Sequence, residues 1–211
     1  MIYDSLVYIG YLLLFVNLVL FIKGFTSHDK VFKIFTWYLG IVFCIQMTAS
    51  AYVYFSVNNL FLSHFYFIGQ LVVLSFFYST LLKIKAQKNF LKIAFALGIL
   101  ALGIHYYLDP SQFFKFNLFE IAVTSLLVVV FAMIHLYNML AGEKEFYYVT
   151  VGIIIYLLGS TVLFFVGNLI IGLSSEFKFL TWTLNALLVI IFQLFILFEW
   201  RKSFYKKEIK N

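Results

Sequence analysis

Seven apolar runs follow one another along the chain, each about as long as a membrane-spanning helix and separated by short segments with charged or turn-forming residues. A helix needs about 20 predominantly apolar residues to cross the hydrocarbon core of a bilayer. The runs show no strand-like alternation, and an unpaired backbone cannot sit in lipid, so each run is predicted to be helical. The predicted helices cover residues 5–23, 33–57, 60–82, 90–108, 116–138, 147–172 and 178–200. The sequence therefore predicts an all-α polytopic membrane protein built as a seven-transmembrane-helix bundle.

The composition excludes a water-soluble domain. Of the 211 residues, 64% are hydrophobic and 11% are charged, whereas soluble domains contain about 45–50% apolar and about 25% charged residues. The seven runs leave little chain for anything else. We therefore expect one transmembrane domain at residues 1–200 and a short basic tail at residues 201–211, too short for a catalytic domain.

Basic residues gather in alternate connecting segments. The first, third and fifth connections, with the helix ends beside them, and the tail contain 13 of the 15 Lys and Arg residues; the other connections contain Lys115 and Lys178. Cytoplasmic segments of membrane proteins are enriched in Lys and Arg, so the amino terminus is predicted outside and the carboxyl terminus in the cytoplasm. Lysine outnumbers arginine 14 to 1, a usage typical of AT-rich bacterial genes, and we expect the inner, cytoplasmic membrane of a bacterium.

The net charge of +6 arises from basic residues at helix ends. Such residues meet lipid headgroups, so no nucleic-acid partner is predicted. In the tail, cations alternate with aromatic residues, a pattern that suits contact with an anionic membrane surface or with a cytoplasmic partner. The residues predicted for this contact are Arg201, Lys202, Lys206 and Lys207.

With this orientation, seven polar or aromatic residues fall in the outer half of the predicted bundle. They are His64, Gln70, His105, Glu120, Asn168, Trp182 and Asn185. A charged group facing lipid costs about 2.5–3.5 kcal/mol on insertion scales, so Glu120 is expected to point toward other helices. We expect the seven residues to line an outward-facing cavity that binds a small or lipidic ligand. In the alternative interpretation, the Asn, Gln and His side chains form interhelical hydrogen bonds worth about 0.6 kcal/mol each.

Glycines occur inside two of the predicted helices. They are Gly98 and Gly103 in residues 90–108 and Gly159, Gly167 and Gly172 in residues 147–172. Small residues let membrane helices approach each other closely, so packing contacts are expected at these positions.

No catalytic residue, metal site or cofactor is predicted. Zinc needs three or four converging His, Cys, Asp or Glu ligands, and the sequence has no HxxxH or HExxH pair to support His64, His105 and Glu120. A retinal Schiff base needs a lysine deep in the last helix, and residues 181–199 contain none. Asn17 and Gln46 are polar residues in the middle of predicted helices, which keeps a transporter as an alternative.

The last third of the chain contains four short motifs: Tyr156-Leu-Leu-Gly-Ser160, Phe164-Phe-Val-Gly-Asn168, Trp182-Thr-Leu-Asn185 and Glu199-Trp-Arg-Lys202. With these motifs the chain resembles bacterial seven-helix sensor modules of the kind called diverse intracellular signalling receptors. Such modules are often joined to histidine kinases or encoded beside them. Because family members usually carry an output domain, the resemblance implies either a truncated module or signalling through a separate partner.

The leading prediction is a non-enzymatic membrane sensor or receptor-like module. It would bind its ligand in the outer half of the bundle and pass a helix displacement to a cytoplasmic partner through the last helix and the basic tail. The expected partners are the lipid bilayer, a signalling protein such as a histidine kinase, and a second copy of the chain in a homo-oligomer. The alternatives are a small-solute membrane transporter and a membrane-embedded metal-dependent lipid hydrolase.

Overall fold

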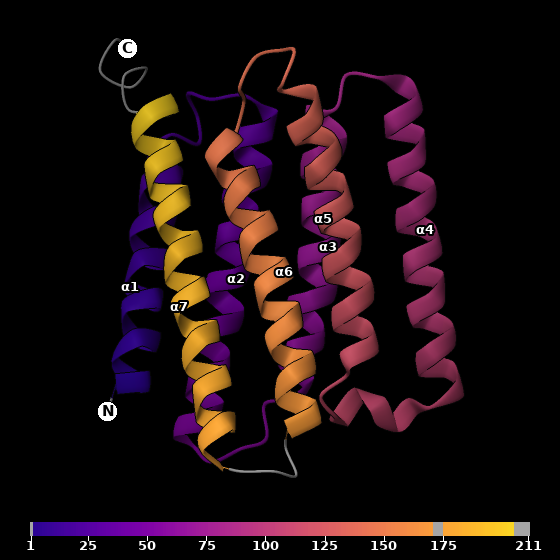
Figure 1. Ribbon diagram of the computed structural model, residues 1–211. Helices are drawn as coiled ribbons and strands as arrows, with labels where there is room; N and C mark the ends of the chain where they lie inside the picture. The colour runs from indigo at the N-terminus through magenta and orange to yellow at the C-terminus, as the bar shows by residue number, and fades with distance from the viewer. Residues whose placement is uncertain (1, 171–174, 205–211) are drawn as a thin grey trace. The chain divides into compact units, whose positions relative to one another are not determined.

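Long α-helices make up almost all of the chain (Figure 1). The computed structural model describes residues 2–170 and 175–204, and within these ranges it contains helices and turns but no strand. The helices are α1 (Ile2–Lys23), α2 (Lys30–Tyr54), α3 (Phe61–Leu81), α4 (Lys85–Leu108), α5 (Leu118–Asn138), α6 (Tyr147–Ile170) and α7 (Ser175–Glu199). Two short segments, the 3₁₀-helix η1 (Pro110–Phe114) and the π-helix η2 (Trp200–Phe204), follow α4 and α7.

In the described ranges, seven helices are long and apolar enough to cross a membrane. This confirms the predicted all-α chain with seven such helices and is the pattern of a multi-pass membrane protein. The helix predicted to begin at residue 90 begins at Lys85 instead. A lysine can lay its aliphatic stem along apolar surface and keep its charge in water, so a helix can extend beyond its apolar run.

The helices form two compact units. Unit 1 contains α1, α6, α7 and η2, and unit 2 contains α2, α3, α4, η1 and α5. Unit 1 therefore joins the first helix of the chain to the last two. The single domain expected at residues 1–200 remains a prediction.

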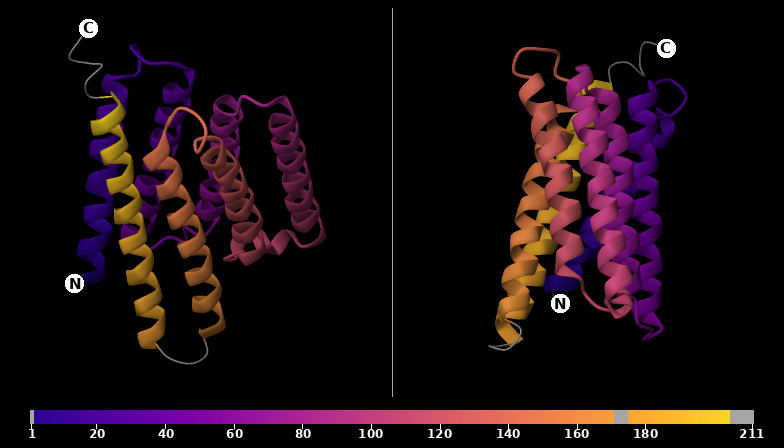
Figure 2. Two further views of the ribbon diagram at one scale, coloured as in Figure 1. Left: turned by 45° about the horizontal axis from the view of Figure 1, so that its top comes forward. Right: turned by 90° about the vertical axis from the view of Figure 1, so that its right-hand side faces the viewer.

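In unit 1, α7 contacts both α6 and α1 (Figure 2). α1 runs parallel to α7, because Tyr3 meets Phe179 near one end and Phe21 approaches Phe204 beyond the other, with ring centroids 6.2 and 6.1 Å apart. α6 runs antiparallel to α7, as expected for consecutive helices joined by a short connection.

Glycines of α6 allow α7 to approach closely. A Cβ atom at Gly152 would lie 2.8 Å from Phe195 Cβ, and one at Gly159 would lie 2.7 Å from Leu188 Cδ1. At Gly167 it would lie 2.9 Å from a Thr181 methyl group. All three distances are shorter than ordinary van der Waals contact, so a Cβ atom at any of these positions would force its neighbour on α7 to shift.

The glycine predictions have mixed outcomes. Packing contacts are confirmed at Gly159 and Gly167, and also at Gly98, where a Cβ atom would meet the side chain of Leu127. The prediction is wrong for Gly103, where an added Cβ atom would have nothing within 4 Å because this glycine lies on an open face of α4. Gly172 lies outside the described residues.

In unit 2, α2 packs against α3 through an aromatic core. The rings of Phe35 and Phe77 are 5.3 Å apart, and both residues are fully buried. α4 is the more exposed helix of this unit, with Leu91, Gly98 and Leu102 as its buried residues. η1 then leads the chain from the end of α4 toward the start of α5 (Figure 2).

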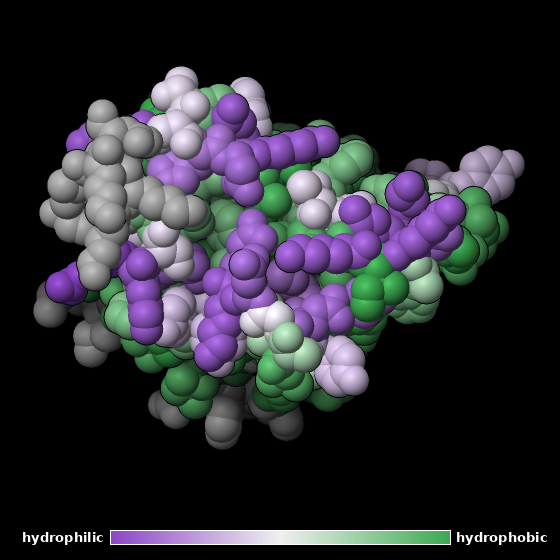
Figure 3. Space-filling model, turned by 90° about the horizontal axis from the view of Figure 1, so that it is seen from above, coloured by the Kyte–Doolittle hydropathy of each residue, from purple (hydrophilic) through white to green (hydrophobic). Residues whose placement is uncertain are grey.

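The end of unit 2 at which α3 passes into α4 is hydrophilic (Figure 3). Lys83, Lys85 and Lys92 are exposed there. These residues belong to one of the basic connections that predict orientation. The opposite end of unit 2 is formed by the α2–α3 connection and η1.

Candidate functional site

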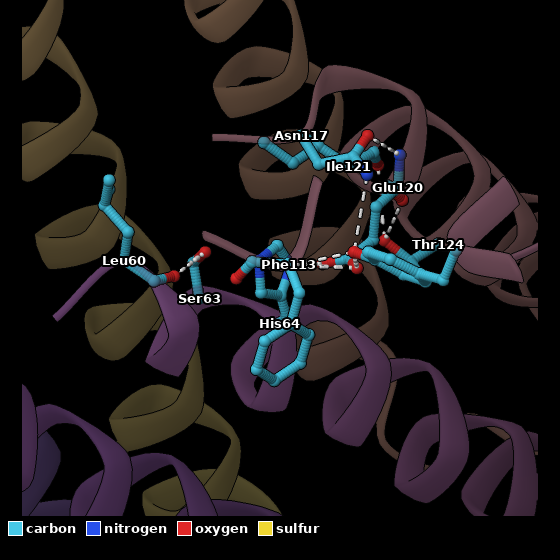
Figure 4. Close-up of polar contacts among 9 residues, drawn as sticks. Leu60, Ser63, His64, Phe113, Asn117, Glu120, Ile121 and Thr124 are labelled. Carbon is cyan, nitrogen blue, oxygen red and sulfur yellow. Dashed lines mark hydrogen bonds and ion pairs between the residues drawn. The ribbon is translucent and has the colours of Figure 1, made fainter. Parts of the chain in front are cut away.

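An acidic and an imidazole side chain meet inside unit 2, near the end formed by η1. His64 lies in the first turn of α3, and Glu120 lies in the first turn of α5. His64 Nδ1 is 3.1 Å from both Glu120 carboxyl oxygens. The two residues are only 2% and 1% exposed. Figure 4 shows their side chains pointing toward each other. The prediction that Glu120 points inward is confirmed.

The end of α4 contributes a third ionisable group. The Tyr106 hydroxyl donates a hydrogen bond to Glu120 Oε2 and also lies 2.9 Å from His64 Nδ1. Asn117 binds both Tyr106 and Glu120. Its Nδ2 donates to Tyr106 Oη over 3.4 Å, and its Oδ1 accepts from the Glu120 backbone N–H over 3.1 Å. An Asn just before a helix commonly caps it in this way.

η1 closes over the imidazole ring. His64 Nε2 lies 2.9 Å from the Phe113 carbonyl oxygen, and the Phe113 ring is stacked on the His64 ring at a centroid distance of 5.0 Å. Both ring nitrogens of His64 are therefore engaged (Figure 4). We call His64, Tyr106, Phe113, Asn117 and Glu120 the His64–Glu120 cluster.

Asp109 shapes the start of η1. Its carboxylate accepts hydrogen bonds from the Ser111 hydroxyl at 2.6 Å and from Gln112 Nε2 at 2.7 Å. These bonds, with that of Ser111 first in effect, lower the pKa of Asp109 below its ordinary value because they favour the charged form. Pro110 follows at the first position of η1, where no backbone donor is needed.

Two further predicted residues of unit 2 have different surroundings. Gln70 Nε2 donates a hydrogen bond of 2.9 Å to the buried Tyr38 hydroxyl and so connects α3 with α2. This contact fits the interhelical hydrogen-bond interpretation. The His105 ring lies against Phe119 and Tyr106, at centroid distances of 4.8 and 5.7 Å. His105 thus adjoins the His64–Glu120 cluster without a hydrogen bond to it.

The remaining three predicted residues belong to unit 1. Asn168 is exposed, and the Trp182 ring lies 6.0 Å from that of Phe164. The side-chain oxygen of Asn185 is buried and has no hydrogen-bond partner within the described ranges. Of the seven predicted ligand residues, the structure therefore brings His64 and Glu120 together, with His105 beside them. Gln70 lies elsewhere in unit 2, and Asn168, Trp182 and Asn185 lie on α6 and α7 of unit 1.

Sequence reasoning missed Tyr106, Phe113 and Asn117. Asn117 carries a recognisable signal, because it stands three residues before Glu120 at a helix start. Tyr106 carries none, since 15 tyrosines are spread along the chain and this one lies at a predicted helix end. Phe113 acts through its backbone oxygen, which any residue type would supply.

A second buried polar contact lies in unit 1, between the middle of α1 and α7. Asn17 Nδ2 is 2.9 Å from both the backbone oxygen and the side-chain oxygen of Gln193. Both residues are almost completely buried. The Asn17 side-chain oxygen has no hydrogen-bond partner among the described residues.

The predicted membrane-surface residues are only partly described. Arg201 and Lys202 lie in η2 and are exposed. Lys202 Nζ donates a 2.9 Å hydrogen bond to the Tyr148 hydroxyl and lies 5.3 Å from the centre of that ring. Lys206 and Lys207 lie outside the described residues.

In the described ranges, no three His, Cys, Asp or Glu side chains come together as a metal site. Comparison with protein-family models, curated proteins and solved structures finds no match. Fold and site together therefore define a class, an all-α chain with the seven apolar helices of a multi-pass membrane protein and a buried acid–imidazole cluster.

Proposed function

We propose that the protein is an integral membrane sensor or receptor-like module of the bacterial cytoplasmic membrane. Its amino terminus lies outside and its carboxyl terminus in the cytoplasm, because the basic residues gather in the connections that this orientation makes cytoplasmic. In this orientation η1 and the His64–Glu120 cluster belong to the outer half of the membrane.

The buried His64–Glu120 pair carries the proposal. Ionisable residues inside membrane helices are costly and mark functional sites by default. Here two of them are 2% and 1% exposed, on α3 and α5, and are joined by a tyrosine from α4. A change at this cluster alters the contacts among three helices and η1 at once. The cluster is therefore the element through which a stimulus from outside acts.

The output runs through the cytoplasmic end of unit 1. There, Glu199 at the end of α7 binds the start of α6, and η2 extends α7 with exposed Arg201 and Lys202. A cytoplasmic partner such as a histidine kinase would bind this end of unit 1 and respond to its displacement. The exposed cations also suit the anionic lipid surface beside it.

Variants of the cluster test the sensor function in cells. Glu120→Gln and His64→Gln are compared with Glu143→Gln, on the exposed α5–α6 connection, and with Lys85→Gln at the exposed start of α4. The measurement is the transcript profile of cells that carry each variant at the native gene, at equal protein amounts in the membrane. The cluster variants should alter one set of transcripts that both controls leave unchanged. Unaltered transcripts in both cluster variants would refute the sensor function.

A transporter is the second candidate, and Asn17 is the observation that favours it. A buried side-chain oxygen that has no partner among the described residues, in the middle of α1, could serve a solute crossing the membrane. Purified protein in liposomes should move no solute if it is a sensor. Solute flux that Asn17→Ala abolishes would replace the sensor function by transport. A metal-dependent lipid hydrolase predicts turnover that a chelator stops.

A further inference from the structure

A lysine and a tyrosine meet at the surface of unit 1, where η2 comes close to the start of α6. Lys202 Nζ donates a hydrogen bond of 2.9 Å to the Tyr148 hydroxyl oxygen and lies 5.3 Å from the centre of the tyrosine ring. The Phe198 ring lies edge-on to the Tyr148 ring at a centroid distance of 4.6 Å, and Lys202 Nζ is 5.8 Å from its centre. We call these three residues the Lys202–Tyr148 triad.

A buried carboxylate fixes the two helices that carry the triad. Glu199, which is 1% exposed, accepts hydrogen bonds from the Tyr148 and Val149 N–H groups with one oxygen. Its other oxygen accepts from the Ser203 hydroxyl. Both Glu199 oxygens thus have partners inside unit 1, whereas the Lys202 ammonium group remains at the exposed surface.

The triad presents hydrogen-bond donors at one point of this surface. An ammonium group has three N–H donors and no acceptor, so the bond to Tyr148 leaves two donors on Lys202 and leaves the tyrosine's own hydrogen for an acceptor. A phosphate oxygen between the two groups would accept from both, and hydrogen bonds to an ionised partner are about twice as strong as neutral ones. Arg201, which is also exposed, adds a second positive charge on η2.

An exposed apolar row leads along α7 to the triad. Its members, between 38% and 48% exposed, are Leu187, Ile191, Leu194 and Phe198. They recur at intervals of three and four residues and therefore share one face of the helix. A surface that is apolar along its length and charged at its end matches a phospholipid, in which the acyl chains and the phosphate follow the same order. A free phosphate ion would use the charged end alone.

We propose that the Lys202–Tyr148 triad and the apolar row bind one anionic phospholipid. Lys202 and Tyr148 hold its phosphate, and an acyl chain lies along the row on α7. This is a defined site, in addition to the general attraction of basic residues to a membrane, and it does not depend on the sensor function. In the orientation proposed above the site faces the cytoplasmic leaflet, whose surface is negatively charged. The bound lipid joins the start of α6 to η2, as Glu199 does from inside unit 1.

Native mass spectrometry of the full-length protein in a non-ionic detergent tests the proposal. The probe is phosphatidylglycerol, and phosphatidylcholine is the lipid without net charge. Wild-type protein should bind one phosphatidylglycerol more tightly than any phosphatidylcholine. Lys202→Gln and Tyr148→Phe should each weaken this binding about fivefold, the size expected for one cation at an anionic surface or for one hydrogen bond. Equal affinity for the two lipids would overturn the proposal.

A neighbouring lysine and tyrosine provide the matched control. Lys144 Nζ lies 5.4 Å from the centre of the Tyr147 ring, at the same end of α6. Lys144→Gln and Tyr147→Phe remove the same chemical groups outside the triad and should leave the affinity for phosphatidylglycerol unchanged. If Lys144→Gln weakened binding as much as Lys202→Gln does, surface charge alone would explain the attraction, and the site would be refuted.

Tyr148→Phe keeps the test decisive if Lys202→Gln does not fold, because it retains the ring that packs against Phe198. Inorganic phosphate, added as a competitor at the concentration of the lipid, should not displace phosphatidylglycerol. Displacement would identify a site for the free ion and would overturn the lipid as its occupant. The lipid site and the sensor function fail separately, since lipid affinity is measured on the purified protein and transcripts are measured in cells.

Discussion

The Glu199 carboxylate, at the end of α7, accepts a hydrogen bond of 2.7 Å from the backbone N–H of Tyr148 in the first turn of α6. Val149 N–H lies 3.4 Å from the same oxygen, and the Ser203 hydroxyl donates to the other oxygen at 2.5 Å. The start of a helix carries partial positive charge and unpaired N–H groups. Glu199, only 1% exposed, therefore caps α6 from a different helix and ties the two together.

Glu199→Ala should destabilise unit 1. The first turn of α6 loses its acceptor, and the loss of a helix cap costs about 0.5–2 kcal/mol. Thermal unfolding of the purified protein in detergent should show a lower midpoint. Glu199→Gln, which keeps one acceptor oxygen, should lower the midpoint less, and Glu143→Ala on the exposed connection should lower it least. Equal midpoints for wild type and Glu199→Ala would contradict the cap.

Asn17 and Gln193 should be energetically coupled. In a double-mutant cycle of Asn17→Ala and Gln193→Ala, the coupling energy should fall near the values for buried hydrogen bonds between membrane helices, about 0.6 and at most about 1.7 kcal/mol. Asn17→Ala should cost more than Gln193→Ala, since Asn17 also binds the Gln193 backbone oxygen, which the second substitution leaves in place. Strictly additive substitutions would argue against this contact.

Substitutions of His64 and of Glu120 should have strongly non-additive effects on the free energy of unfolding. Glu120→Leu alone leaves a buried imidazole without its acid, and removal of one partner of a buried ion pair costs about 3–5 kcal/mol. The double variant Glu120→Leu, His64→Phe removes both polar groups and should be more stable than the sum of the single losses predicts. Denaturant unfolding in detergent measures the stability of all three variants.

A methyl group should be tolerated at Gly103 of α4 but not on the face of α6 that meets α7. Gly152→Ala places its Cβ against Phe195 Cβ, an atom fixed to the α7 backbone, and overpacking typically costs about 1–3 kcal/mol. Gly159→Ala should cost less, because the atom it meets is the movable end of Leu188. Gly103→Ala meets nothing and should be neutral or stabilising. The order of unfolding midpoints checks this ranking.

Acid should loosen η1 through Asp109. Because the folded-state pKa of Asp109 is lowered, its contribution to stability is fully present above the ordinary Asp pKa, about 3.9, and is lost as the pH falls through the lowered value. Hydrogen exchange of the Ser111 amide, corrected for the intrinsic effect of pH, should therefore rise only below about pH 4. Asp109→Asn should remove this dependence. A rise that Asp109→Asn leaves intact would contradict this role of Asp109.

Most of the fold could be predicted from the sequence. The run at residues 116–138 became α5 (Leu118–Asn138), and the run at residues 60–82 became α3 (Phe61–Leu81). Long apolar runs predict helices well because the bilayer requires every backbone group to be paired within its own segment. The start of α4 was harder to predict from the sequence, because Lys85 and Lys88 interrupt the apolar pattern without interrupting the helix.

The candidate site was predictable only in part. Glu120 could be recognised as an inward-facing acid because burial in lipid is costly whatever its partner is. Gln70 illustrates the limit, since its depth and face suggested a ligand cavity, yet it donates to Tyr38 on α2. A side chain's depth follows from sequence position, whereas its partner depends on which helix lies opposite.

The sequence by itself therefore determined the class of this protein, an all-α chain with seven helices apolar enough to span a membrane, because length and hydrophobicity are properties of each segment alone. Only the tertiary structure decided which polar groups meet. His64 and Glu120 are 56 positions apart, and Asn17 and Gln193 are 176 apart. Such pairs depend on the order in which helices pack and on the rotation of each helix about its axis, and a hydrogen bond forms only where both bring donor and acceptor within reach.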